Sequence, residues 1–413
     1  MTLIDAPRSA TTLRNELGLN DSFTEDACKQ YAQILQKKWT VITTLQRKVI
    51  SLESKITNLE AILQSNLGNL TTQTQRDPIK WLPGKATYTL ESHRAAINCV
   101  AFHPTHPSLA SGSDDFTIKI WSWEYGEFEK TLKGHTRAIT GLEFGGQKDR
   151  TLLASCGHDL MIKIWDPSSE YAYIRTMVGH DHSVSCIRFL RPGENILVSA
   201  SRDSSIRIWD ASTGICTNLI NTNLDWIYDV CPSPDGQSLV SVGRDQAATI
   251  WDLTTGEART TLLGHENYIE CSTYAPHASY SYLATMTGMR VSPTALNSIE
   301  FLVTAGRDKT IKLWDSRGVL IKTFIGHNNW VKGLVFHPGG RFLLSVADDG
   351  TIRCWDLAQE GRLSKTIEVS GGFFSCIGWA PSTIHSDKED PGEVELRCVV
   401  ATGSADSRLR VFM

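Results

Sequence analysis

Side chains that could act as a nucleophile, a base and an acid recur together along this chain. An aspartate is present in seven copies, at Asp115, Asp159, Asp203, Asp245, Asp308, Asp349 and Asp406. A hydroxyl residue stands four positions before each aspartate, at Ser111, Ser155, Ser199, Ser241, Thr304, Ser345 and Thr402. Five copies also have a histidine upstream, at His93, His135, His180, His265 and His327. Ser, His and Asp form the triad of many hydrolases. Because five identical active sites in one chain would serve no purpose, we interpret the sets as structural.

Other patterns that carry chemistry are missing from the sequence. There is no Gly-x-Ser-x-Gly elbow, no phosphate-binding glycine loop and no His-Glu-x-x-His pair. The ten cysteines include no Cys-x-x-Cys spacing. Four of them, Cys99, Cys186, Cys271 and Cys376, share one repeat position where other copies have glycine, so we expect small buried residues there. We predict a protein that is not an enzyme and has no cofactor or metal.

The composition and the lack of long apolar stretches argue against nucleic acids and membranes as partners. Lys and Arg total 41 and Asp and Glu total 45, a net charge of −4 that argues against a chain organised around nucleic-acid binding. No stretch approaches the ~20 apolar residues that span a bilayer, and residues 1–12 lack the pattern of a secretion signal. We expect a cytoplasmic protein that neither binds nucleic acid nor inserts into a membrane.

The recurring aspartates belong to a longer repeat that specifies the fold. Six residues after each aspartate stands an aromatic residue, at Trp121, Trp165, Trp209, Trp251, Trp314, Trp355 and Phe412. An indole N–H could join the histidine, the hydroxyl and the carboxylate in one chain of hydrogen bonds. Alternating stretches such as TIKIW predict strands, and a four-stranded unit cannot bury its faces alone. We therefore predict an all-β, seven-bladed β-propeller of the WD-repeat type at residues 85–413.

The sequence also predicts how the ring closes. The strand before each histidine has a common pattern, as in TLKGH and TFIGH, and the same pattern occurs before the first repeat as TLESH. The last repeat ends at Met413 without such a strand. We expect residues 86–90 to complete the seventh blade, which removes an exposed sheet edge. Two insertions, at residues 277–298 and 382–395, should fall between the first and second strands of blades five and seven.

Apolar residues before the ring follow a heptad. Positions a and d hold Ile42, Leu45, Val49, Leu52, Ile56, Leu59 and Leu63. β-Branched residues at a with Leu at d favour a parallel dimer, so we predict a coiled-coil dimerisation helix at residues 24–66 and a homodimer. The alternative is a single amphipathic helix packed against the ring. Residues 67–84, which contain Asp77-Pro78 and Pro83-Gly84, predict a linker.

A binding site should appear as a departure from the repeat. Two repeat positions should project from the same mouth of the ring. The first, directly before the aspartate, holds Arg202, Arg244 and Arg307 in blades three to five. The second, three residues after the histidine position, holds Trp226, Tyr268, Trp330 and Phe373 in blades four to seven. Arg, Trp and Tyr are enriched at interface hot spots, so we predict a docking site for an acidic protein surface. The alternative is that these arginines form ion pairs between blades and the rings cap the channel.

The stretch KKWTVITTLQRKVISLESKI, followed by RDPIKWLP, SASRDSSIRIWD, GRDKTIKLWD and GHNNWVKGLVFHP, resembles the lissencephaly-protein family, in particular its fungal nuclear-distribution (NudF-type) members. The resemblance runs from about Leu13 to Met413. The family begins with a LisH motif, and TTLRNELG at residues 11–18 resembles only its end, so residues 1–23 are expected to be a remnant of that region or a truncated start. Relatives often have basic residues where this chain has Tyr228 and Gly350.

This resemblance implies a non-catalytic, dimeric regulator of cytoplasmic dynein. It implies binding to the dynein heavy-chain motor domain, action with NudE-type coiled-coil proteins at microtubule plus ends and spindle poles, and a role in nuclear migration and spindle positioning. The family's motor contacts match Arg202, Arg307 and Trp330. Two alternatives remain: a generic WD adaptor, such as a ubiquitin-ligase receptor or a G-protein β-like subunit, and a noncatalytic subunit of an acetylhydrolase.

Overall fold

The computed structural model describes residues 81–147, 150–191, 193–222, 225–287, 300–369, 372–381 and 398–413. The predicted LisH remnant, the heptad from Ile42 to Leu63 and the linker up to residue 80 lie outside the described residues, and so do residues 288–298 of the first insertion and all of the second.

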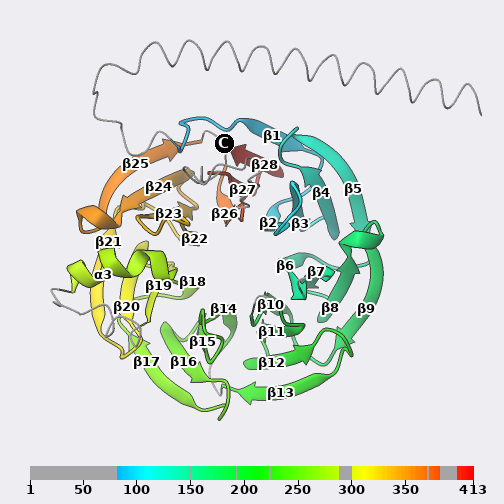
Figure 1. Ribbon diagram of the computed structural model, residues 1–413, viewed down its shortest axis with the longest axis horizontal. Coiled ribbons are helices and arrows are strands. Elements are labelled where there is room, and N and C mark those ends of the chain that lie inside the picture. Colours follow the sequence, from blue (N-terminus) through cyan, green and yellow to red (C-terminus); the bar gives the residue numbers. More distant parts are fainter. Residues whose placement is uncertain are drawn as a thin grey trace, which may run out of the picture. The chain divides into compact units, whose positions relative to one another are not determined.

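Each repeat folds into a four-stranded antiparallel sheet, and seven such sheets form a ring (Figure 1). The apolar cores lie between neighbouring blades. In one cluster, Ile118 and Ile120 of blade one pack with Ile139 and Leu142 of blade two. The third strands are therefore buried on both faces, as a sheet that packs against two neighbours requires. This confirms the predicted seven-bladed propeller.

The first four blades comprise β2 (Ile97–Phe102), β3 (Ser108–Ser113), β4 (Thr117–Ser122) and β5 (Glu127–Lys133); β6 (Ile139–Gln147), β7 (Arg150–Gly157), β8 (Met161–Asp166) and β9 (Ala172–Val178); β10 (Val184–Phe189), β11 (Ile196–Ser201), β12 (Ser205–Asp210) and β13 (Cys216–Asn221); and β14 (Ile227–Pro232), β15 (Ser238–Gly243), β16 (Ala247–Asp252) and β17 (Ala258–Leu263). Blades five to seven comprise β18 (Ile269–Tyr274), β19 (Phe301–Gly306), β20 (Thr310–Asp315) and β21 (Leu320–Ile325); β22 (Val331–Phe336), β23 (Phe342–Ala347), β24 (Thr351–Asp356) and β25 (Arg362–Glu368); and β26 (Phe374–Trp379), β27 (Val400–Ser404), β28 (Arg408–Phe412) and β1 (Tyr88–Glu91). The short helices are η1 (Pro167–Ser169), η2 (His277–Ser279), α3 (Tyr280–Met286) and η3 (Leu357–Gln359). As predicted, the insertion in blade five, which carries η2 and α3, lies between that blade's first and second strands.

Strand β1 closes the ring, as predicted. It pairs antiparallel with β28, with Leu90 opposite Leu409, so the two ends of the propeller lie side by side (Figure 1). The strand begins at Tyr88 rather than Ala86, but Thr87 already donates its N–H to the carbonyl of Val411 at 2.7 Å. Leu90 is buried in the core between blades seven and one.

The recurring polar residues form the predicted network in the five blades that have the histidine. In blade one, His93 bonds to Asp115 through Nδ1 at 2.8 Å and to Ser111 through Nε2 at 2.8 Å. The indole of Trp121 donates to the same hydroxyl at 2.8 Å. Blades two, three, five and six repeat this geometry. Burial alone would raise the pKa of Asp115, but hydrogen bonds from Thr117, the Arg94 N–H and His93 outweigh it and lower the pKa to about 2.

Blade seven keeps its aspartate satisfied by another means. Arg410, which is buried, donates to Asp406 at 2.5 Å and to Ser404 at 2.6 Å. The guanidinium of Arg410 therefore supplies to its aspartate the donors that histidine supplies elsewhere.

Blade four, which also lacks the histidine, keeps only part of the network. The indole of Trp251 donates to the Ser241 hydroxyl at 2.8 Å, while burial raises the pKa of Asp245.

The end of the predicted linker is part of the ring. Leu82 is buried among residues of blades six and seven. The Trp81 ring lies 4.7 Å from that of His337, 5.3 Å from Trp379 and 5.6 Å from Phe342, measured between centroids. Residues 81 and 82 thus anchor the chain to the propeller before β1 begins, a role that the repeat pattern did not indicate.

We predict that β1 is required for ring stability through its buried side chain. Leu90→Ala should lower the free energy of unfolding by about 2–5 kcal/mol, since it leaves a cavity in a packed core. Thr89→Ala, on the exposed face of the same strand, should change it by less than about 0.5 kcal/mol. Chemical denaturation of both variants measures this, and equal effects would contradict closure by β1.

We also predict that acid weakens the ring through His337. Burial lowers the pKa of His337 to about 4, and its Nδ1 accepts the N–H of Gly339 at 2.9 Å. Between pH ~6.5 and ~4 the unfolded chain binds a proton that the folded ring does not. The free energy of unfolding should therefore fall as the pH falls through this window.

His337→Asn keeps an acceptor for Gly339 but does not titrate, so its unfolding free energy should depend less steeply on pH. His277→Asn, at an exposed position, is the matched control and should behave like the unmodified chain. Equal pH dependences in all three proteins would refute the role of His337.

Candidate protein-interaction site at the mouth of the ring

The two repeat positions singled out in the sequence face each other in every blade. The residue before the aspartate donates its backbone N–H to the carbonyl of the residue three after the histidine position. The seven bonds measure 2.8–3.0 Å and run from Asp114 to Ala96, His158 to Ala138, Arg202 to Ser183, Arg244 to Trp226, Arg307 to Tyr268, Asp348 to Trp330 and Ala405 to Phe373. Both positions therefore lie at the same mouth of the ring, as predicted.

The predicted arginines and aromatic residues stack alternately around one side of this mouth. The guanidinium carbon of Arg202 lies 5.1 Å from the ring centroid of Trp226 in the next blade. That of Arg244 lies 5.0 Å from Trp226 on one side and 5.6 Å from Tyr268 on the other. These are cation–π distances, and each arginine reaches the aromatic residue of the following blade.

The series continues through blades five and six. Arg307 lies 5.2 Å from the centroid of Tyr268 and 4.3 Å from that of Trp330. Lys332 covers Trp330 at 5.2 Å. We call Arg202, Trp226, Arg244, Tyr268, Arg307 and Trp330 the Arg–aromatic ladder. All six predicted site residues are thus brought together, and their role in binding a partner stays a prediction.

Carboxylates accompany two of the three ladder arginines. Arg244 lies 3.5 Å from Asp225 and donates from Nε to the Tyr268 hydroxyl at 3.2 Å. Arg307 donates from Nε to Glu270, and Lys332 lies 3.2 Å from the other oxygen of that carboxylate. The arginine ion pairs lie within single blades, whereas the contacts between blades are cation–π stacks, the Arg244–Tyr268 hydrogen bond and the Lys332–Glu270 pair. The alternative prediction is that the arginines form ion pairs between blades. Lys332 forms such a pair, but Arg244 and Arg307 do not.

Sequence reasoning passed over an inner circle of residues below the ladder. The position five residues after the histidine position holds Asn98, Thr140, Ser185, Tyr228, Glu270, Lys332 and Ser375. Only blades four to six have a large or charged residue there, the same side that carries the ladder. Comparing this position across repeats, as was done for the other two, would have identified Glu270 and Lys332.

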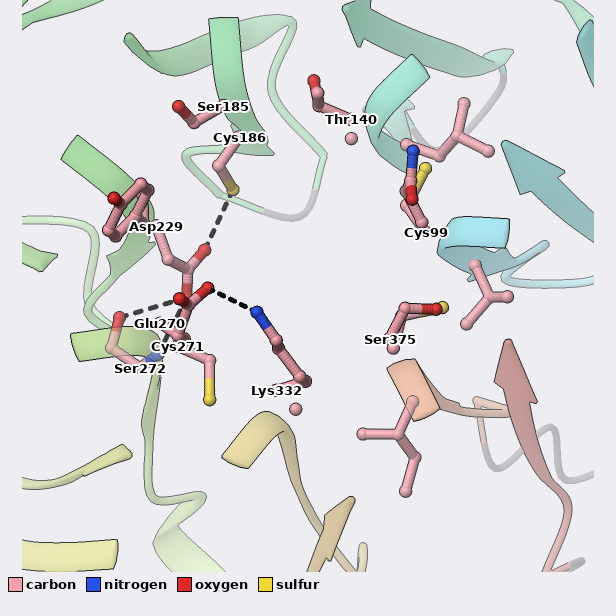
Figure 2. Close-up of a pocket in the computed structure, with 18 of the residues that line it drawn as sticks. Cys99, Thr140, Ser185, Cys186, Asp229, Glu270, Cys271, Ser272, Lys332 and Ser375 are labelled. Atoms are coloured by element: carbon pink, nitrogen blue, oxygen red, sulfur yellow. Dashed lines mark hydrogen bonds and ion pairs between the residues drawn. The ribbon is translucent and has the colours of Figure 1, made fainter. Parts of the chain in front are cut away.

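The inner circle lines a cavity of about 460 Å³ in the centre of the ring (Figure 2). Glu270 and Lys332 point toward each other there, and Asp229 accepts hydrogen bonds from the Cys186 thiol at 3.0 Å and the Ser272 N–H at 2.8 Å. Thr140 donates to the carbonyl of Val184 in the next blade at 2.6 Å. These polar groups are used to join blades.

The cavity shows no sign of reactive or metal-binding groups within the described residues. Burial raises the pKa of the thiols of Cys99, Cys186 and Cys271, and that of Cys376 to about 12, so these thiols are poor nucleophiles and ligands. No group of three or more His, Cys, Asp or Glu side chains that could hold a metal occurs in the described part of the chain. No helix among the described residues is both long and apolar enough to cross a bilayer.

The two sides of the mouth differ in character. Trp330 keeps 37% of its surface exposed even with Arg307 and Lys332 against it. Blades one and two have only alanine, Ala96 and Ala138, at its repeat position. A large, rigid and partly exposed aromatic surface with guanidinium groups is typical of protein-interaction hot spots.

Comparison with known proteins agrees with this architecture. The family described as "WD domain, G-beta repeat" matches residues 84–122, 126–166, 172–210, 214–252, 256–315 and 318–356. The chain is 60% identical to "Nuclear distribution protein PAC1-1" of Uncinocarpus reesii, an alignment that covers 100% of this chain and 96% of that protein. It is 55% identical to "Nuclear distribution protein nudF" of Emericella nidulans, over 100% of this chain and 95% of the relative.

A further relative, "Nuclear distribution protein PAC1" of Gibberella zeae, is 52% identical over 98% of this chain and 94% of its own length. Matches of this identity across essentially whole chains confirm the resemblance stated from the sequence. The chain therefore belongs to the PAC1/nudF family of nuclear distribution proteins, built on a WD-repeat propeller.

Proposed function

We propose that this chain is a non-catalytic regulator of cytoplasmic dynein that binds the dynein heavy-chain motor domain through the Arg–aromatic ladder. It would support nuclear migration, spindle positioning and delivery of dynein to microtubule plus ends. The names of its relatives support the nuclear-distribution role, and the resemblance to the lissencephaly-protein family supports dynein as the partner.

The observation that carries the docking site is the stacked ladder itself. Stacking fixes the arginines and rings before a partner arrives, so less side-chain entropy is lost on binding. Guanidinium groups pair bidentately with carboxylates. A partner that presents acidic side chains together with apolar surface therefore fits this side of the mouth.

The hydroxyls of the recurring Ser/His/Asp sets support the absence of catalysis. Ser111, Ser155 and Ser199 are fully buried, and so are Thr304 and Ser345. Each receives an indole N–H and bonds to its histidine, as Ser111 does to His93. A substrate could not reach these hydroxyls without disrupting the blade.

Dimerisation through the heptad between Ile42 and Leu63 belongs to the same proposal. Two rings on one coiled coil could engage a dimeric motor with higher avidity than one ring. A NudE-type coiled-coil protein would be a second partner, with microtubule plus-end factors reached indirectly. The site of action would be the cytoplasm and its microtubules, including the spindle pole.

We predict that loss of the ladder abolishes motor binding. The combined variant Arg202→Ala, Arg244→Ala, Arg307→Ala and Trp330→Ala should weaken binding to purified dynein motor domain at least about 100-fold, because hot-spot residues contribute about 2 kcal/mol or more each. Equilibrium binding with and without nucleotide measures the change.

Two single variants on the same mouth serve as controls. Arg94→Ala removes an exposed arginine from blade one, and Phe373→Ala removes an exposed aromatic residue from blade seven. Arg94→Ala should leave binding within about twofold, whereas Phe373, which shares the repeat position of the ladder aromatics but lies outside the ladder, tests where the site ends: a loss of more than about twofold would extend the site to blade seven. If a folded ladder variant binds the motor as well as the unmodified chain, the site is wrong. If the unmodified chain does not bind at all, a generic WD adaptor becomes the better interpretation.

We predict that the heptad makes the chain a dimer at micromolar concentration. Leu45→Asp with Leu52→Asp places charges at two d positions and should give a monomer in sedimentation velocity, since burying unpaired carboxylates in the seam is unfavourable. Ser51→Asp with Ser54→Asp, at positions c and f of the same turns, should stay dimeric. A strictly monomeric unmodified chain would contradict the dimer.

A further inference from the structure

The cations around the mouth differ in whether a carboxylate forms an ion pair with them. Arg307 and Lys332 share the carboxylate of Glu270, and Arg244 is paired with Asp225. No carboxylate forms an ion pair with Arg202 within the described residues. Four positive charges on one side of the mouth therefore leave one guanidinium without a counter-ion.

Glu270 is placed to pair with two cations at once, although its single negative charge offsets only one of their two positive charges. It lies on the first strand of blade five, with its side chain only 12% exposed, between Arg307 of the same blade and Lys332 of blade six. Figure 2 shows its carboxylate directed at the Lys332 ammonium inside the cavity. Both cations rest on Trp330, at 4.3 and 5.2 Å from its ring centroid. The carboxylate thus also positions Arg307 and Lys332 against that ring.

We infer that Glu270 is a specificity-determining residue of the mouth, an internal counter-ion that makes the ladder reject polyanions and accept a protein surface carrying an isolated carboxylate. This inference rests on the proposed function, because it takes the ladder as the partner-binding surface. The partner's carboxylate pairs with Arg202, while its apolar side chains contact Trp226 and Trp330.

The reason is electrostatic. Affinity for a polyanion comes from the number of uncompensated cations that can release its counter-ions. A cation already paired with Glu270 gains less from a second anion, because the shared carboxylate offsets part of its positive charge. The flat faces of the rings stay available for apolar contact, which does not depend on charge. The ladder therefore distinguishes a protein surface from a polyanion by the shape of the apolar surface and by a single ion pair at Arg202.

The test uses the full-length protein and a labelled single-stranded oligothymidylate as the polyanion. Glu270→Gln keeps the size of the side chain and releases Arg307 and Lys332. Its affinity for the probe should rise at low salt. The plot of log affinity against log salt concentration should steepen by about 0.7 to 1.4, since the lost carboxylate offset one charge shared by two cations and each cation that gains a phosphate contact contributes about 0.7 for single strands.

Asp114→Asn is the matched control. It raises the net charge by the same amount on the same mouth, but Asp114 pairs with Asn98 and not with a ladder cation, so the slope should not change. Glu270→Gln combined with Lys332→Met should steepen the slope less than Glu270→Gln alone, by about 0.7 at most, because only Arg307 is then released, and it replaces Glu270→Gln as the test if that variant is unstable. Slopes equal to that of Asp114→Asn in both variants would overturn the inference.

Failure of this inference can be distinguished from failure of the proposed function. The probe assay contains no motor protein, so a chain that does not bind the motor can still show the predicted slopes. Conversely, motor binding that depends on the ladder stands even if Glu270→Gln leaves polyanion binding unchanged. Tighter motor binding by Glu270→Gln in parallel with probe binding would also overturn the inference, because the mouth would then respond to total charge alone.

Discussion

The tight turn between the second and third strands of each blade is the constraint on which the mouth depends. The residue after each recurring aspartate has a positive φ in all seven blades: Phe116, Leu160, Ser204, Gln246, Lys309, Gly350 and Ser407. Left-handed backbone costs an L-residue roughly 1–2 kcal/mol. The aspartate offsets this, because its carboxylate accepts the N–H two residues on, as Asp115 does from Thr117 at 3.0 Å. The histidine and hydroxyl then fix the carboxylate, and the residue before it is held at the mouth.

In each repeat, the positions that stabilise the fold are therefore different from the positions that could bind a partner. Positions inside the network are interchangeable between blades, which is why spacing alone predicted the propeller, the closure by β1 and the location of the insertions. The positions on either side of the network are free to vary, so their variation between blades indicated where a partner could bind. The same argument predicts that Arg202, Arg244 and Arg307 share one side of the mouth with Trp226, Tyr268 and Trp330.

Other features could not be predicted because they depend on side chains from different repeats meeting in space. The pairing of Glu270 with Lys332 crosses two blades, and the repeat pattern does not say which of several neighbours a long side chain will choose. Arg410 replaces histidine within a single repeat, but five other repeats also have Lys or Arg four residues after the aspartate, so this position did not distinguish blade seven. The Trp81 anchor lies before the first repeat and packs on residues more than 250 positions away, such as His337, so no periodicity could reveal it.

The stacked ladder resolves a physical conflict in the mouth. Several arginines crowded together would repel one another and attract any polyanion, yet a protein partner is best held by rigid guanidinium and aromatic groups. Intervening rings keep neighbouring guanidinium groups apart and hold them by cation–π contact, while Asp225 and Glu270 remove the excess charge. What remains is a firm surface of reduced positive charge, on which Arg202 is the one ladder arginine without a carboxylate partner among the described residues. Such a surface attracts negatively charged molecules less strongly at long range. It is more selective for a partner whose shape and single charges match it.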